Sequence, residues 1–122
     1  MKRGLSTGKP TKREAERIVA CKEGFCIACY VMADRLGHMV SWAGGCDYHH
    51  LKSGNVRRGH SFGIGLCPYH HRRIPFDGYT IEQTREFVGP SLMDGSRLFH
   101  ETYGSDDELL AIQNELIGWT DE

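Results

Sequence analysis

The stretch that decides the fold runs from Cys26-Ile27-Ala28-Cys29 to Cys67-Pro68-Tyr69-His70. Each end is a tight knuckle in which two residues separate two metal-ligand side chains, a spacing with which one turn can bind a single zinc ion. Structural zinc takes four such ligands in a tetrahedron. The sequence therefore predicts that Cys26, Cys29, Cys67 and His70 bind one structural zinc ion.

The cysteine count favours metal binding over disulfide bonds. The chain has 122 residues and five cysteines, and an odd number that includes a CxxC pair is typical of a reducing compartment. A domain of this length buries only about two-thirds of its chain surface, so a zinc ion supplying on the order of 10 kcal/mol of apparent folding energy would matter. We interpret the remaining cysteines, Cys21 and Cys46, as ordinary small residues.

Capping boxes predict helices on both sides of the knuckles. Thr11 and Thr80 are each followed three residues later by Glu or Gln, which predicts helices over 11–22 and 80–89. Residues 95–103 and the acidic segment after Ser105 predict two more helices. On the first helix we expect the basic residues to face solvent, whereas its buried face should carry Ala15, Ile18 and Val19.

The insert between the knuckles carries strand signals. Residues 38–42 and 46–51 predict two short strands around a Gly44-Gly45 turn, and a Gly- and Arg-rich loop follows over 52–61. We therefore expect an α+β fold with a flexible basic arm over 1–10 and one domain over 11–122. No apolar run approaches the ~18 residues of a membrane span and no secretory segment is evident, so we expect a cytoplasmic protein without membrane contact.

Two histidine doublets lie beside the predicted zinc site, His49-His50 in the insert and His70-His71 at the second knuckle. Closing both knuckles on one ion folds the insert back and could bring the first doublet across from His71. A neutral imidazole can bind a divalent metal, and an unligated one can take a proton from water. Together these two roles suffice to hydrolyse a phosphodiester. The alternative is that both doublets are ordinary polar residues of a purely structural zinc module.

Basic residues surround the histidines. The 52–73 segment contains five Lys or Arg residues and no acid, a local charge that suits a phosphate backbone. We expect these residues to bind DNA: Lys52, Arg57, Arg58, Arg72 and Arg73.

Four pieces of the chain occur in the order and at the spacing of a known family. They are Glu14-Ala15-Glu16-Arg17-Ile18, Cys26-Ile27-Ala28-Cys29-Tyr30, Tyr48-His49-His50-Leu51 and Leu66-Cys67-Pro68-Tyr69-His70-His71. Through them, the run from Thr11 to His71 resembles the HNH nucleases, which share a ββα-metal (His-Me finger) core. It is most similar to the phage Ref-type, recombinase-dependent DNA endonucleases.

The resemblance implies a role for each matching position. His50 would be the general base that activates water, and His49 and His71 would bind a catalytic divalent metal, which could be Mg²⁺, Mn²⁺ or Zn²⁺. The zinc-stapled core would span 24–80, with C-terminal helices over 80–118.

Two positions depart from the family pattern. Many HNH proteins have another metal-binding His or Asn a few residues after the position of His71, where this chain has Arg72-Arg73-Ile74-Pro75. A third ligand would come from elsewhere, with His100, Asp94 or His60 as candidates. Asn55 is the nearest counterpart of the middle Asn of the family name.

These expectations lead to one leading hypothesis and two alternatives. The leading hypothesis is a metal-dependent DNA endonuclease of phage or prophage origin in a bacterial host, and the resemblance implies stimulation by a recombinase filament. One alternative is a non-catalytic, zinc-containing module that binds nucleic acid. The other is a phage recombination adaptor that contacts a host protein through its acidic C-terminal helix, which begins at Asp106.

Overall fold

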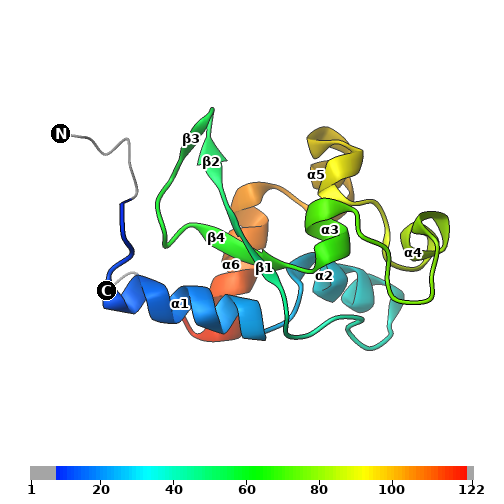
Figure 1. The fold of residues 1–122 in the computed structure, drawn as a ribbon, viewed down its shortest axis with the longest axis horizontal. Helices are drawn as coiled ribbons and strands as arrows, with labels where there is room; N and C mark the ends of the chain where they lie inside the picture. The colour runs from blue at the N-terminus through cyan, green and yellow to red at the C-terminus, as the bar shows by residue number, and fades with distance from the viewer. Residues whose placement is uncertain (1–7, 121–122) are drawn as a thin grey trace.

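The computed structural model describes residues 8–120, in which helices pack around one short antiparallel sheet, and a second antiparallel pair of strands extends from the body (Figure 1). This mixture of helices and strands confirms the expected α+β class. The arm predicted over 1–10 lies mostly outside the described residues. In chain order the elements are α1 (Lys12–Glu23), α2 (Ile27–Leu36), β1 (Asp47–His50), β2 (Lys52–Ser53), β3 (Val56–Arg57), β4 (Gly63–Leu66), α3 (Pro68–Arg72), α4 (Ile81–Val88), the 3-10 turn η2 (Leu92–Asp94), α5 (Ser96–Tyr103) and α6 (Asp106–Ile117).

The predicted capping boxes form as expected. Thr11 Oγ1 accepts a hydrogen bond from the Glu14 amide at 3.1 Å, and Glu14 Oε1 accepts one from the Thr11 amide at 2.8 Å. The caps of α4 and α6, at Thr80 and Ser105, have the same reciprocal pattern. These local bonds satisfy the first amides of each helix, which is why sequence alone located the three helix starts.

The insert differs from the prediction in its first half. Residues 27–36 form α2, which was not predicted, and the strand expected over 38–42 is absent from the described structure. Residues 42–46 instead bond to the end of α1: the amides of Gly44 and Cys46 donate to the carbonyls of Gly24 and Lys22 at 2.8 and 3.0 Å. This segment therefore wraps the first knuckle and does not pair in a sheet.

The strand predicted over 46–51 is present as β1, but its partner is β4. The antiparallel ladder sets His49 opposite Ile64 and His50 opposite Gly63. The predicted loop over 52–61 contains a small hairpin, β2–β3, which projects from the body of the molecule (Figure 1). Strand β4 leads directly into Cys67 and α3, so the β1–β4 ladder lies next to the second knuckle.

The buried face of α1 also differs from the prediction. Val19 is 51% exposed, whereas Arg17, expected to face solvent, is only 2% exposed. The Arg17 guanidinium donates to Tyr48 Oη at 3.0 Å, to Asn114 Oδ1 at 2.6 Å and to the Gly63 carbonyl at 2.8 Å. These three bonds compensate the burial of its charge. Arg17 therefore ties α1 to β1, β4 and α6.

Among residues 8–120, none of the helices is both long and apolar enough to cross a bilayer.

Candidate metal centre and histidine groove

The four predicted zinc ligands converge in the core. His70 Nδ1 lies 3.4 Å from each of the three cysteine sulfurs, and the sulfurs of Cys29 and Cys67 are 4.0 Å apart. A tetrahedral zinc ion, with bonds of about 2.3 Å to sulfur and about 2.0 Å to nitrogen, sets its ligand atoms roughly 3.5–3.8 Å apart. Within the described part of the chain, this is the one group of three or more such side chains close enough to hold a metal ion.

The acid–base chemistry of the cluster also calls for a cation. Burial raises the pKa of the Cys26 thiol well above its usual value. Hydrogen bonds with Cys26 and Cys67 raise the pKa of Cys29, and those from Cys26 and Cys29 lower the pKa of Cys67. Three buried sulfurs in contact cannot all be anionic unless a positive charge lies among them. The donor set therefore fits a structural metal such as zinc.

Each knuckle is built as the cap of a helix. Cys26 and Cys67 are the N-cap residues of α2 and α3, and their sulfurs accept 3.4 Å hydrogen bonds from the amides of Cys29 and His70. The amides at a helix N-terminus stabilise negative charge, so both helices favour the thiolate form that a metal requires. The same geometry explains why α2 begins directly after the first ligand.

A second layer of groups orients His70. Its Nε2 lies 3.1 Å from the Val88 carbonyl and 3.0 Å from Tyr103 Oη, and that hydroxyl donates to the same carbonyl at 2.6 Å. A carbonyl only accepts, so Nε2 carries the ring proton and Nδ1 presents its lone pair to the sulfurs. Sequence analysis missed Tyr103, because a hydroxyl 33 residues from its partner leaves no local pattern.

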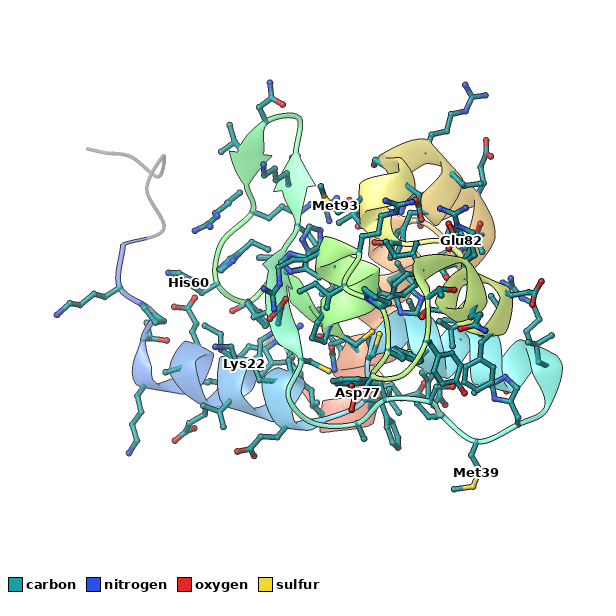
Figure 2. The ribbon with its side chains drawn as sticks, turned by 45° about the vertical axis from the view of Figure 1, so that its right-hand side comes forward. Lys22, Met39, His60, Asp77, Glu82 and Met93 are labelled. Atoms are coloured by element: carbon teal, nitrogen blue, oxygen red, sulfur yellow. The ribbon has the colours of Figure 1, made fainter. Side chains whose placement is uncertain are left out.

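The catalytic histidines predicted from the resemblance lie beside a groove of about 550 Å³, which we call the histidine groove. His50 and His71 both line it, and the His49 ring lies against the His71 ring with centroids 5.3 Å apart. Two further lining residues, Lys22 and His60, are labelled in Figure 2. The complete lining is Pro10, Ile18, Lys22, Asp47, Tyr48, His50, His60, His71 and Arg72.

His49 and His50 occupy successive positions in a regular ladder, so their side chains leave β1 on opposite faces. His49 meets His71, whereas His50 meets the edge of the Tyr48 ring, with centroids 5.1 Å apart. Burial and the neighbouring His71 lower the pKa of His49 to about 4. Burial and the Arg57 charge lower the pKa of His50. Both imidazoles are therefore neutral near pH 7, the form that a metal ligand or a base requires.

A carboxylate orients His71. Its Nδ1 donates to Asp47 Oδ2 at 2.8 Å, and Arg72 Nε donates to the same oxygen at 2.8 Å. Although partial burial opposes the charge, these two donors hold the pKa of Asp47 below its usual value. With its proton on Nδ1, His71 keeps Nε2 as the lone-pair nitrogen, an arrangement common among metal-binding histidines. Sequence analysis had not selected Asp47, which stands two positions before His49.

The three candidates for a third catalytic ligand have different surroundings. Both ring nitrogens of His60 are hydrogen-bonded, to His50 and to the Gly8 carbonyl, at 3.1 and 2.8 Å. Asp94 forms ion pairs with two arginines and accepts a bond from the Ser91 amide. Both ring nitrogens of His100 also have partners, the Gly104 carbonyl at 3.0 Å and Asp106 at 3.3 Å, and the charges of His100 and Asp106 influence the pKa of His49. Of the three, His100 therefore has the clearest link to His49.

The five predicted DNA-binding residues fall into two groups. Lys52 and Arg57 form a register pair on the β2–β3 hairpin, and both are exposed. The other three basic side chains are already in ion pairs, Arg58 with Asp107, Arg72 with Asp47 and Arg73 with Asp94, at 2.7, 2.8 and 2.9 Å. Asn55, at the tip of that hairpin, does not line the histidine groove.

One comparison with known proteins identifies the chain. A family model described as recombination enhancement, RecA-dependent nuclease matches residues 10–118, which include the metal centre, the histidine groove and the C-terminal helices. No curated protein matches the chain. Because the family match covers nearly the whole sequence, the chain belongs to this family of nucleases linked to recombination.

Proposed function

We propose that this member of the RecA-dependent nuclease family is a metal-dependent DNA endonuclease of the HNH type. The observation that carries the proposal is the meeting of two histidine pairs at β1 and α3: His50 and His71 line one groove, and His49 lies against His71. The neighbouring metal centre supports it, because the cysteines and His70 join the start of α2 to α3, the helix that carries His71 into that groove.

Each histidine has a separate role in this proposal. His50, neutral because burial lowers its pKa, takes the proton from the attacking water. His49 and His71 bind a divalent metal, and Asp47 holds His71 with its Nε2 lone pair available. When bound, that metal would polarise the scissile phosphate and stabilise the leaving oxygen.

The remaining ligand comes from the α5–α6 region in our proposal. His100 and Asp106 form a pair whose charges influence the pKa of His49, and we propose these two side chains as the candidates for completing the coordination. Oxygen atoms of the phosphate and of water would fill the other positions. This open arrangement is the one expected of a catalytic site, which keeps coordination positions for its substrate.

DNA binding would rely first on the exposed hairpin pair, Lys52 and Arg57, whose charges are available to phosphates. Arg58, Arg72 and Arg73 would have to exchange their carboxylate partners for phosphate oxygens. The family assignment adds the second partner, RecA, and we propose that a RecA filament on DNA presents the strand to be cut.

A plasmid-nicking assay tests this function. Purified protein is incubated with supercoiled plasmid and Mg²⁺ or Mn²⁺, with and without a RecA filament on single-stranded DNA. We expect nicking by wild type and a loss of roughly 10²- to 10⁴-fold for His50→Ala, the usual contribution of a general base. His38→Ala, which changes an exposed histidine remote from the groove, is the matched control and should nick normally.

The same assay separates the leading proposal from a non-catalytic module that binds nucleic acid. That alternative is favoured by one observation: within residues 8–120, His49 and His71 do not converge with a third ligand as the zinc cluster does. It predicts DNA binding without nicking under every condition. Nicking that survives His50→Ala would contradict the base assignment, even if the protein is a nuclease.

A further inference from the structure

A line of three groups runs from the histidine groove toward the start of α1. His50 Nε2 lies 3.1 Å from His60 Nδ1, and His60 Nε2 lies 2.8 Å from the Gly8 carbonyl oxygen. His60 is only 8% exposed. Figure 2 shows it at the segment that joins β3 to β4, on the side of the molecule where the chain enters α1. Both ring nitrogens of this buried histidine are thus committed to named partners.

The carbonyl at the end of this line determines where the ring protons lie. A carbonyl oxygen has lone pairs and no proton, so His60 Nε2 must carry the hydrogen. A neutral imidazole has one N–H, and therefore His60 Nδ1 presents a lone pair to His50. The facing nitrogen, His50 Nε2, must then be the donor. Neutral His50 is left with its lone pair on Nδ1.

We propose that His60 is a positioning residue, which holds His50 in the tautomer protonated at Nε2 and so makes Nδ1 the nitrogen that accepts a proton from water. This inference rests on the proposed function, in which His50 is the general base. When the water O–H bond breaks, its proton moves to Nδ1 and the remaining oxygen bonds to phosphorus. The phosphorus–oxygen bond to the leaving group breaks, and the new imidazolium keeps its Nε2–H on His60.

The main chain of His60 is fixed as firmly as its ring. Tyr48 Oη donates to the His60 carbonyl at 2.6 Å, and Arg17 Nε donates to Tyr48 Oη at 3.0 Å. Gly63, opposite His50 in the sheet, makes room for the Tyr48 ring, because a Cβ at Gly63 would lie 2.4 Å from that ring. Arg17, Tyr48 and Gly63 therefore fix the position of His60, which in turn contacts His50.

This support distinguishes His60 from the third metal ligand considered above. A ligand to the metal at His49 and His71 would need a lone pair directed at those side chains. The lone pair of His60 Nδ1 is directed at His50 Nε2 instead, 3.1 Å away. The geometry thus favours a role exerted through His50 over one exerted through the metal.

Two amide variants of zinc-loaded, full-length protein test the proposal by activity. The side-chain oxygen of Asn can occupy the Nδ1 position and accept the bond from His50, whereas the Gln amide reaches the Nε2 position and keeps only the Gly8 bond. We expect His60→Gln to lower kcat for plasmid nicking about 10- to 100-fold with KM for DNA unchanged. His60→Asn should stay within a few-fold of wild type. Equal activity of His60→Gln and wild type, in a protein that nicks, would overturn the inference.

Nitrogen NMR of the histidine rings provides a readout that does not require cleavage. Near neutral pH, zinc-loaded wild type should show His50 protonated at Nε2 and bare at Nδ1, and His60→Gln should show a mixture of the two tautomers. A proton on Nδ1 of wild-type His50 would overturn the inference. The expected tautomer in a protein that never nicks would contradict the proposed function and leave the assignment of the protons standing.

Discussion

The metal centre and the histidine groove use the same kinds of side chain on neighbouring elements, yet they are built differently. All four residues of the metal centre are fully buried, and their ligand atoms lie within 4.8 Å of one another. In the groove, His49, His50 and His71 are half-buried, and among the described residues their ligand atoms form no such compact group. A structural site is closed around its ion, whereas a catalytic one leaves room for substrate. The difference therefore matches the two roles proposed.

One turn of α3 joins the two regions. His70 and His71 are adjacent, and successive side chains on a helix point about 100° apart. His70 consequently faces the sulfurs, and His71 faces Asp47 and the groove. Changes confined to one region therefore test how far the metal centre and the histidine groove are coupled.

The largest effect should follow from breaking the metal centre. Cys29→Ser removes one sulfur from a site expected to supply on the order of 10 kcal/mol, comparable to the whole stability of ~5–15 kcal/mol of a small domain. We expect loss of zinc and of the cooperative unfolding transition, measured by metal analysis and circular dichroism. Cys46→Ser, a buried thiol outside the cluster, should cost only about 1 kcal/mol. A stably folded, zinc-free Cys29→Ser protein would contradict this account of the core.

A smaller effect should follow from loosening the groove alone. Arg17→Met deletes three hydrogen bonds and leaves the Gly63 carbonyl without its arginine donor, so we expect a cost of about 2–4 kcal/mol in unfolding free energy. Zinc should be retained and nicking should fall. Arg13→Met changes an exposed arginine stacked on the same Trp119 ring, and its cost should be below about 1 kcal/mol. Equal costs in denaturant titrations of the two variants would contradict the structural role of Arg17.

The support of His70 can be weakened without removing a zinc ligand. Tyr103→Phe deletes a hydroxyl that lies 3.0 Å from His70 Nε2 and keeps the ring. Loss of an outer hydrogen bond of this kind lowers metal affinity by roughly 10- to 100-fold. Competition with a zinc chelator measures the effect. The zinc-saturated variant should nick plasmid as fast as wild type, because the change does not touch His50. An unchanged zinc affinity would show that the Val88 carbonyl alone orients the ring.

A separate effect should be a dependence of stability on pH. The pKa of His49 falls from its usual value of about 6.5 in the unfolded chain to about 4 in the fold. Between these values the unfolded chain binds more protons, so the contribution of neutral His49 is complete above pH ~6.5 and is lost as the pH falls toward ~4. Without added catalytic metal, His49→Asn should therefore show a flatter pH profile of unfolding free energy than wild type. Parallel profiles would contradict the burial of a neutral His49.

The parts of the fold that sequence could predict depend on short-range chemistry. The ligands Cys26 and Cys29 stand three positions apart, and each capping box spans four residues, so both leave a local pattern. The helix α2 was missed because its N-cap is a cysteine, a residue outside the usual set of caps. The strand expected over 38–42 failed because nearby amides bond to the end of α1, which no local periodicity reveals.

The parts of the candidate site that sequence could not predict depend on contacts between distant residues. From sequence alone, Arg17 is expected to face solvent. The structure shows that it is buried and that Gly63 and Asn114 accept hydrogen bonds from its guanidinium. The tautomer of His50 follows from a carbonyl at Gly8, 42 residues away along the chain. The choice of His49, His50 and His71 came from a family resemblance, and their chemical roles remain predictions that experiments must test.

The separation of a structural zinc site from a catalytic metal site can be tested by anomalous scattering from crystals soaked in Mn²⁺. We predict a zinc peak among Cys26, Cys29, Cys67 and His70, and a distinct manganese peak bound by His49 and His71. The manganese peak would also identify the third ligand, for which His100 and Asp106 are the candidates. Manganese bound elsewhere, with none at His49 and His71, would contradict the proposed separation of a structural metal centre from a catalytic metal site.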